Sequence, residues 1–474
     1  MTKAMSESRR NFLRRSGCAL MGAGALAAHV EQFGLIHAFA RAQSLSDYKA
    51  LVCIFLEGGN DGNNTVVPVD DYNAAGGYAS VRGASNLSLP QSSLLPLSPP
   101  SQQGRKYGLH PNLVELQTLF NQNRLAVLCN TGTLVQPLTR QLYRSGVGHP
   151  YQLFSHSDQV EQQQTCISAQ PGHTGWGGRI SDVMSGANGA APLPLAISTA
   201  GTSLLMSGDD TRQLVVNPEV RLNELFRVDL GNDFSLANTE VRRIAFNRIR
   251  ADATAKLSRA AAETVEQAMQ AGFALSLDPV LPPLQAGQTD FQTTPLGKQL
   301  KQVAKIISLR AQLGVRRQIF FCSLGGFDHH NNQRTAANSH DALLLQVSKA
   351  LKAFHDATVN LGVAAEVTTF TLSDFGRTFE PSGTGAGVGT DHAWGNHQFI
   401  MGGAVRGGDF YGTFPTLALG GPDDADERGR WIPTTSTEQY AATLGLWFGL
   451  PHASLPAVFP LLGRFPASNL GFMS

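Results

Sequence analysis

Continuous apolar runs that end abruptly in glycine- and asparagine-rich segments constrain the fold of this 474-residue chain more than any other feature. These runs cover residues 50–57, 125–130, 317–324 and 366–372. A strand that is apolar at every position is buried on both faces, which is typical of a parallel sheet. Segments with helical spacing separate the runs, at residues 113–120, 297–313 and 339–361. The alternation predicts an α/β fold with a mainly parallel central sheet.

Other segments complete the predicted order of elements. Asn238, Thr239 and Glu240 can cap a long helix that runs to about residue 269, and a proline-rich linker follows at 279–292. Residues 195–231 mix short strands and turns without a clear period. Near the end, Thr435, Ser436, Thr437 and Glu438 fit a capping box for a helix that ends near residue 449. We therefore expect one domain over 43–474, with a helical insertion around 238–275.

The first 42 residues have the features of an export signal. Arg9 and Arg10 precede an apolar pair, and the weakly apolar stretch 18–28 is too short to span a bilayer. This pattern predicts a twin-arginine signal peptide over 1–42, cleaved after Ala42, and the alternative is an uncleaved amphipathic helix. We expect the twin-arginine translocase as a partner during export, and a periplasmic or secreted mature protein with no membrane span.

Charge and cysteine usage argue against two properties, which are nucleic-acid binding and disulfide bonds. Beyond the leader, 31 basic residues face 34 acidic ones, so no basic surface for nucleic acid is predicted. The mature chain keeps Cys53, Cys129, Cys166 and Cys322. Three of the four lie in apolar, strand-like runs, so we expect buried free thiols rather than disulfides.

Side chains that can bind metal follow the predicted strands directly. Asp61 follows the first run, Asp328 with His329 and His330 follows the third, and Asp374 follows the fourth, with His392 and His397 beyond it. Because the carboxyl ends of parallel strands meet at one crevice, the three carboxylates are expected to converge and to need a cation. The oxygen and nitrogen ligands suit Zn, Mn, Mg or Ca, and oxygen-only neighbours would favour the harder ions.

Each of these segments also has a simpler interpretation. Asn60, Asp61 and Gly62 can form an ordinary turn, and His329 and His330 can be solvated loop histidines. Asp391 and His392 lie in a glycine-rich loop. Several such loops in sequence order, three of which leave apolar strands, favour the metal site over these alternatives.

The same motifs resemble the exported bacterial family called domain of unknown function 1501. The similarity rests on FLEGGNDGNN, FSHSDQ, GWGGR, GGFDHHNNQ, SDFGRT and GTDHAWGNHQFIMGGAVRGGDFYG, which occur in this order over nearly the whole mature chain. That family is in turn similar to the alkaline phosphatase and sulfatase superfamily. The resemblance implies an alkaline phosphatase-like three-layer sandwich that holds one or two divalent metal ions and a serine, threonine or formylglycine nucleophile.

The resemblance also implies roles for individual residues. Asp61 corresponds to an acidic ligand of one metal, whose partner in the superfamily is an Asp-His pair. That pair aligns with Asp374 and Phe375, so the histidine is missing unless His397 replaces it. The ligands of the other metal correspond to Asp328, His330 and His392, and this second set is complete.

The nucleophile and the anion-binding groups follow from the same alignment. Ser155 is the candidate nucleophile by alignment and Ser157 by proximity, while either Ser155 or His156 could instead cap a helix that starts near Asp158. Arg377 and Arg179 are candidate clamps for an oxyanion, or structural ion-pair partners. The chain has no Cys-x-Pro-x-Arg motif, so an ordinary formylglycine sulfatase is disfavoured.

Two functions are consistent with these residues. The first is an exported metal-dependent hydrolase of phosphate or sulfate esters, with a small molecule or a polysaccharide ester as substrate. The second is a noncatalytic exported protein that keeps the fold and at most one metal for partner or carbohydrate binding. The retained Asp61, Asp328, His330, Asp374 and His392 favour the hydrolase, and the changes at Phe375 and Ser157 favour the second function.

Overall fold

The computed structural model of the chain describes residues 48–222, 258–259, 267–268, 270–272, 274–275 and 277–474. The expected signal peptide over 1–42 and most of the expected helical insertion around 238–275 lie outside the described residues. Among the helices that are described, none is both long enough and apolar enough to cross a membrane.

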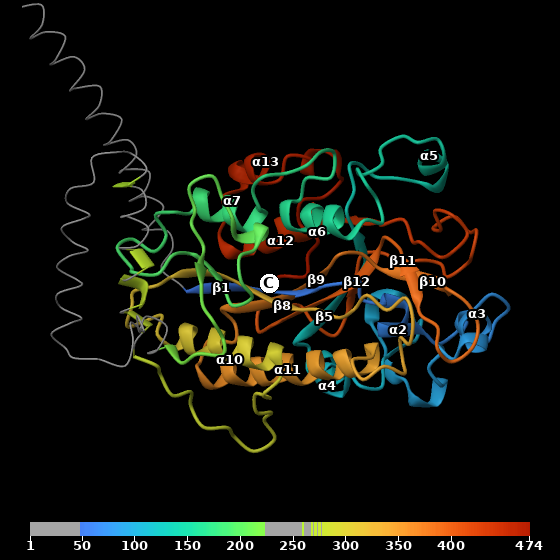
Figure 1. Ribbon diagram of the computed structural model, residues 1–474, viewed down its shortest axis with the longest axis horizontal. Coiled ribbons are helices and arrows are strands. Elements are labelled where there is room, and N and C mark those ends of the chain that lie inside the picture. Colours follow the sequence, from blue (N-terminus) through green and yellow to red (C-terminus); the bar gives the residue numbers. More distant parts are fainter. Residues whose placement is uncertain (1–47, 223–257, 260–266, 269, 273, 276) are drawn as a thin grey trace, which may run out of the picture.

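A mixed central sheet organises the described part of the chain (Figure 1). Its strands follow the spatial order β13-β5-β12-β9-β1-β8-β6-β7, and β14 pairs with β5. The strands are β1 Lys49–Leu56, β5 Leu125–Gly132, β6 Ala196–Ser198, β7 Leu214–Val215, β8 Arg317–Leu324, β9 Val367–Ser373, β12 Asn396–Gly402, β13 Phe410–Tyr411 and β14 Thr435–Ser436. The four apolar runs of the sequence form β1, β5, β8 and β9.

The sheet is parallel except at one strand. β1 pairs in parallel with both β8 and β9, and β6 continues the parallel order beyond β8. β12 lies between β5 and β9 and is antiparallel to both. The apolar-run pattern does not identify β12, because this strand begins with the polar residues Asn396, His397 and Gln398. The prediction of a mainly parallel α/β sheet is confirmed.

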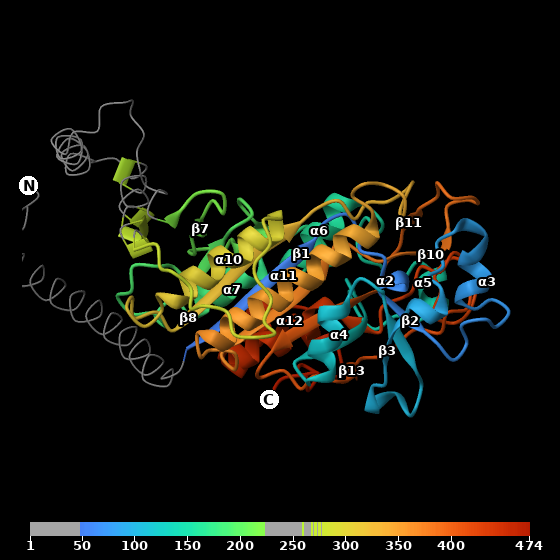
Figure 2. The same cartoon turned by 90° about the horizontal axis from the view of Figure 1, so that it is seen from below.

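Two helical layers cover the faces of the sheet (Figures 1 and 2). α4 Val114–Asn121, α10 Pro295–Ser308 and α11 His340–Asn360 lie on one face, and α6 His156–Thr165, α7 Trp176–Val183, α12 Thr437–Phe448 and α13 Leu455–Val458 lie on the other. Along β1, Val52 and Ile54 join the core on the α10 and α11 side, while Cys53 and Phe55 join the core on the α7 and α12 side. The described chain is therefore a three-layer α/β sandwich.

Smaller elements gather at one end of the sandwich (Figure 1). They are the sheet β2-β4-β3, the hairpin β10-β11 and three short helices. Their bounds are α2 Gly62–Thr65, β2 Val66–Pro68, α3 Tyr78–Arg82, β3 Leu95–Leu97, β4 Tyr107–Leu109, α5 Arg140–Arg144, β10 Arg377–Pro381 and β11 Thr390–His392.

The capping box of α12 lies one residue later than the sequence predicted. Ser436, not Thr435, is the N-cap, and its hydroxyl accepts the backbone N–H of Gln439. The Gln439 side chain in turn accepts the backbone N–H of Ser436. Thr435 and Ser436 both pair with β5 as part of β14, and the helix begins at Thr437, so Ser436 is the residue that directly precedes it. Glutamine satisfies a capping box as well as glutamate does.

The cysteine prediction is confirmed for the described residues. Cys53, Cys129, Cys166 and Cys322 are free and buried. Burial raises the pKa of each thiol, so these side chains act as small apolar residues of the core.

Candidate metal centre

Three neighbouring strands end together at the edge where the polar loops begin. In the register of the sheet, Leu56 of β1 lies opposite Leu324 of β8 and Ser373 of β9. The loops that leave these strands therefore start side by side. Gly58, the second residue after β1, has a φ of +111°, and a Cβ there would lie 2.4 Å from the backbone nitrogen of Asp328. The close approach of the first two loops depends on this glycine.

Three histidines surround the carboxylate of Asp328. Their Nε2 atoms lie near its Oδ1 atom, at 3.5 Å for His156, 3.0 Å for His330 and 3.6 Å for His392. The Nε2 atoms of His330 and His392 lie 2.9 Å apart. The histidines come from α6, from the loop after β8 and from β11. Between 23% and 45% of the side chain of each histidine and of Asp328 remains exposed. The cluster is therefore open to solvent on one side.

The Nδ1 atom of each imidazole faces a hydrogen-bond acceptor. The Nδ1 of His156 lies 2.7 Å from Oδ2 of Asp374, and that of His330 lies 3.1 Å from Oδ1 of Asp391. The Nδ1 of His392 lies 2.7 Å from the backbone carbonyl of Phe154. Carboxylates and carbonyls can only accept hydrogen bonds, so each Nδ1 donates and each neutral ring presents the lone pair of Nε2 to Asp328.

This arrangement fits a bound divalent cation. One ligand atom each from His156, Asp328 and His392 lie within 4.8 Å of one another. The Nε2 atom of His156 is buried and has no hydrogen-bond partner. Two ligands of a tetrahedral zinc ion are separated by about 3.3 Å, close to the spacings around Asp328. Imidazoles backed by carboxylates are the usual surroundings of such ions, and this nitrogen-rich set suits zinc better than magnesium or calcium.

The electrostatics keep two of the ligands in their binding forms. Burial opposes ionisation of Asp328, but the guanidinium of Arg377, 2.9 Å away, lowers the pKa of this carboxyl. Burial lowers the pKa of His392, which favours its neutral ring. The hydrogen bond to Asp374 raises the pKa of His156, so His156 is the ligand for which protons compete most strongly with a metal.

Asp374 lies one step behind the cluster. Its Oδ2 faces His156, and its Oδ1 accepts the backbone N–H of Gly58 at 3.0 Å. The ring of Phe375, the residue after Asp374, packs against His156 and His392 with centroid separations of 4.8 and 4.7 Å. His156 therefore occupies the place beside Asp374 that the sequence left empty.

His397 does not take that place. It is buried in β12, its Nδ1 accepts the backbone N–H of Asn130 at 3.2 Å, and its ring stacks on Phe414. Burial lowers its pKa to about 3, so the ring is neutral and its remaining proton is on Nε2. A protonated Nε2 cannot coordinate a metal.

Asp61 reaches the same edge of the sheet but has other partners. Its carboxylate forms an ion pair with Arg82, with Oδ2 at 2.6 Å from Nη1, and accepts a hydrogen bond from Gln333 at 2.6 Å. It also caps α2 by accepting the backbone N–H of Asn63. Burial opposes its ionisation, but Arg82 lowers the pKa of the carboxyl. The charge of Asp61 is thus balanced by the protein itself.

The candidate nucleophiles lie at the start of α6. Ser155 occupies the N-cap position, but its side chain makes no capping hydrogen bond. Its hydroxyl instead donates to Oδ2 of Asp158 at 2.5 Å and lies 3.2 Å from the hydroxyl of Ser157. Ser157 is exposed. Ser155 directly precedes the proposed ligand His156, so the chain holds it next to the cluster.

Both candidate clamp arginines are directed to acceptors of the protein. Arg377 donates to Asp328, to the carbonyl of Gly58 and to both the carbonyl and the hydroxyl of Thr390. Arg179 donates to the backbone carbonyls of Thr174, Thr165 and Val458. This geometry favours the structural alternative for both side chains.

A second group of titratable side chains does not fit a metal. His110, His340 and Asp341 offer one atom each within 4.8 Å of one another. However, Nδ1 of His110 accepts the backbone N–H of Asn112, so its Nε2 carries the proton and faces Asp341 at 3.2 Å. The comparison shows why the anchor at Nδ1 matters, since it decides whether Nε2 can bind a cation.

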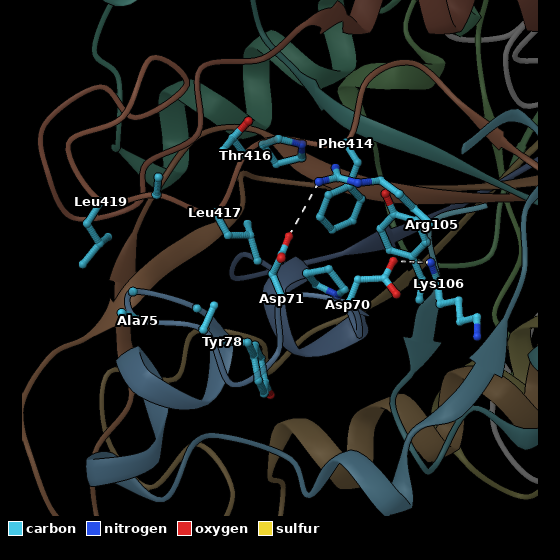
Figure 3. A pocket seen from close by; sticks show the side chains of 17 residues that line it. Asp70, Asp71, Ala75, Tyr78, Arg105, Lys106, Phe414, Thr416, Leu417 and Leu419 are labelled. Atoms are coloured by element: carbon cyan, nitrogen blue, oxygen red, sulfur yellow. Dashed lines mark hydrogen bonds and ion pairs between the residues drawn. The ribbon is translucent and has the colours of Figure 1, made fainter. Parts of the chain in front are cut away.

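A cavity of about 450 Å³ lies elsewhere, between the segment at residues 68–78 and the segment at 414–419 (Figure 3). Tyr107 and Phe414 contribute to its wall, and Arg105 faces Asp71 with 3.6 Å between Nη2 and Oδ2. No residue of the Asp328 cluster lines it. The cavity is therefore separate from the candidate metal centre.

Sequence reasoning missed His156 and Asp391 as site residues. Both were in segments that the motifs singled out, FSHSDQ and GTDH, but attention to the serines hid the histidine between them. A signal for His156 was present in the sequence, because the resemblance implied a histidine beside Asp374 and Phe375 cannot serve as one. The motif FSHSDQ supplies such a histidine, His156.

Comparison with models of protein families gives a match that covers most of the chain. A family model described as protein of unknown function (DUF1501) matches residues 48–428. A search of curated proteins found no match.

Solved structures match over most of the chain at low identity. PsFucS1 sulfatase from Pseudoalteromonas sp. is 10% identical, with 92% of this chain and 73% of that chain covered and a TM-score of 0.30. Ps i-CgsB in complex with k-i-k-neocarrahexaose is 8% identical, with coverages of 88% and 77% and a TM-score of 0.32. A Bacteroides thetaiotaomicron structure described under metabolism of multiple glycosaminoglycans is 11% identical, with coverages of 89% and 82% and a TM-score of 0.30.

Proposed function

The chain belongs to the DUF1501 family of proteins of unknown function, and we propose that it is a metal-dependent hydrolase of phosphate or sulfate esters. The observation that carries the proposal is the convergence of three Nε2 lone pairs on Oδ1 of Asp328, each imidazole being anchored at Nδ1. Arg377 already supplies one positive charge at this oxygen, and the lone pairs gathered around it favour a further cation among them.

His156, Asp328 and His392 would hold the ion, with His330 in contact with two of these ligands. The nitrogen-rich set makes zinc the first choice. Bound there, the ion would act as a Lewis acid that polarises the ester oxygen. Arg377 and Asp374 would position the ligands, because they hold Asp328 and His156 by direct hydrogen bonds.

The remaining polar residues have distinct roles in this proposal. Ser155 would attack phosphorus or sulfur through Oγ, and Asp158, which already accepts its hydroxyl hydrogen, would take the proton. The leaving oxygen would take its proton from solvent, and His330, whose Nε2 carries a lone pair, would accept a hydrogen bond from the water that then releases the phosphate or sulfate from Ser155. The Nδ1 of His330 faces Asp391, and Arg428 holds that carboxylate at 2.7 Å, so the ring has a fixed orientation. Substrates of this kind include small-molecule and polysaccharide esters.

Two features support an anionic substrate. The side chain of Ser155 does not cap α6, so the backbone N–H groups of the first turn remain directed toward the end of the helix at the cluster. Such helix starts attract phosphate and sulfate groups. The exposure of His156, Asp328 and His330 leaves room for a ligand to approach from solvent.

The decisive experiment is elemental analysis of the protein produced through its own export route. We expect about one equivalent of zinc in the wild type, and none in Asp328→Ala with His392→Ala. His173→Ala, which changes an exposed histidine, is the matched control and should keep the metal. A wild type without a stoichiometric metal would remove the ligand assignments.

A second candidate function is favoured by one observation. Each nitrogen of the Arg377 guanidinium is already directed to a protein acceptor, which leaves at most one N–H for an oxyanion. A noncatalytic protein that keeps one metal for partner or carbohydrate binding would need no such clamp. Full zinc content without turnover of any phosphate or sulfate ester in a panel would favour this second function.

The proposal includes export. Arg9 and Arg10 in the leader are the residues a twin-arginine translocase would recognise, and the mature protein would work in the periplasm or outside the cell. Folding before export would allow the metal to be inserted in the cytoplasm.

A further inference from the structure

We propose that Arg430 is a positioning residue for His392 and acts through Phe154. The inference rests on the proposed function, since it assigns a role in holding one ligand of the metal centre. Three segments that are distant in sequence meet here: the residues before α6, strand β11 and the loop that contains Arg430. Together they form a closed set of contacts around the His392 ring.

The first contact fixes which nitrogen of His392 binds metal. The backbone carbonyl of Phe154 accepts Nδ1–H of His392 at 2.7 Å, which leaves Nε2 as the lone-pair nitrogen. Phe154 points its carbonyl this way from a left-handed backbone conformation, with a φ of 70°. A bulky residue rarely adopts that conformation and keeps it only when its surroundings enforce it.

Arg430 supplies that enforcement. Its guanidinium lies over the ring of Phe154, with 4.3 Å between Cζ and the ring centroid. Its Nε donates to the backbone carbonyl of His392 at 2.7 Å, and its Nη1 binds Asp426 at 2.6 Å. One planar side chain therefore fixes both the residue that orients the imidazole and the backbone that carries it.

The arrangement predicts specific effects of substitution. Without Arg430, the Phe154 segment can relax toward ordinary φ values and turn its carbonyl away from His392. The imidazole would then lose its anchor and bind metal in either tautomer. The loss of a group that orients a metal-binding histidine typically lowers metal affinity 10–100-fold. Lysine should not replace Arg430, because it lacks both the planar stack and the Nε–H in this position.

The test measures zinc binding by titration calorimetry and the visible absorption of the cobalt-substituted protein. We expect R430A and R430K to weaken zinc binding about 10–100-fold and to alter the cobalt spectrum, while Arg144→Ala, at an exposed ion pair, leaves both unchanged. F154G removes the other partner of the contact between Arg430 and Phe154. Glycine accepts a φ of 70° and keeps the carbonyl, but it offers no ring to Arg430. F154G should weaken zinc binding less than R430A.

The double variant R430A with F154G decides whether the two residues act together. If Arg430 acts through Phe154, the double variant should bind zinc no more weakly than R430A alone. Additive losses, or a wild-type affinity and cobalt spectrum in folded R430A and R430K, would overturn the inference. Failure of the wild type itself to bind zinc would instead contradict the proposed function, so the two failures are distinguishable.

Discussion

The Nδ1 atom of His156 lies 2.7 Å from Oδ2 of Asp374, across 218 positions of sequence. This pair joins the start of α6 to the end of β9 and turns Nε2 of His156 toward Asp328. A carboxylate at Nδ1 fixes the orientation of an imidazole and makes its Nε2 more basic, which is what the proposed metal site requires of His156.

The first prediction follows from this pair. In Asp374→Asn, the amide has only one oxygen, so it can no longer accept from both Nδ1–H of His156 and the N–H of Gly58, and the negative charge behind His156 is lost. We expect zinc affinity, measured by calorimetry at pH 7, to fall about 10–100-fold, because a less basic imidazole is a weaker ligand. Asp210→Asn, at an exposed position, is the control. Equal affinity in both variants would contradict a role for Asp374 behind the ligand.

The second prediction separates the two serines at the start of α6. Ser155→Ala should abolish turnover of a nitrophenyl phosphate or sulfate, because the attacking hydroxyl is lost. Its zinc content and melting temperature should not change, since the side chain neither binds the cluster nor caps the helix. Ser157→Ala is the matched control and should stay active. Activity of Ser155→Ala at the wild-type rate would exclude this nucleophile.

Much of the fold could be predicted from local patterns. The apolar runs identified β1, β5, β8 and β9, because a strand buried on both faces must be apolar at every position. β12 escaped this rule, since Asn396, His397 and Gln398 are buried through contacts with distant residues, such as the one between Gln398 and Thr371. Sequence alone does not show that a polar side chain will find a buried partner.

The site could be predicted only in part for a related reason. Asp328, His330 and His392 follow strands whose ends must meet, so topology brings them together. Asp61 satisfies the same rule, but Arg82 on α3 neutralises it. His156 comes from a helix across the sheet, and no strand-end rule places it. The partner of each charged side chain depended on long-range packing, which spacing does not encode.

The third prediction tests the corrected capping box of α12. Ser436→Ala should lower the free energy of unfolding by about 1 kcal/mol, because the backbone N–H of Gln439 loses its acceptor in a buried position. Ser155→Ala, at an N-cap without a capping hydrogen bond, should change it by less than about 0.5 kcal/mol. Urea unfolding of both variants gives the measurement. Equal losses would argue against the assignment of Ser436 as the cap.

The fourth prediction concerns export. Replacement of Arg9 and Arg10 by lysines should leave a folded precursor in the cytoplasm, because a twin-arginine receptor recognises the pair and not only its charge. The chain offers its own control in Arg14 and Arg15, whose replacement by lysines should allow export. Cell fractionation followed by immunoblotting distinguishes precursor from mature protein. Export of the first variant at the wild-type level would exclude the twin-arginine route.

The fifth prediction uses a buried acid far in sequence from the metal ligands. Burial raises the pKa of Glu438 to about 8, from an ordinary value of 4.5, and its Oε2 has no hydrogen-bond partner. Between these two pH values the folded protein keeps a proton that the unfolded chain releases, so this residue makes the protein less stable as pH rises. The slope is at most about 1.4 kcal/mol per pH unit, and the loss is complete above the folded pKa.

Glu438→Gln keeps an acceptor for the backbone N–H of Leu461 and cannot ionise, so its stability should exceed that of the wild type at pH 8.5 far more than at pH 5. Urea unfolding at both pH values measures the difference, and Glu366→Gln is a control at a less buried position. Parallel pH profiles of stability for the wild type and Glu438→Gln would show that Glu438 is ionised in the folded protein at neutral pH.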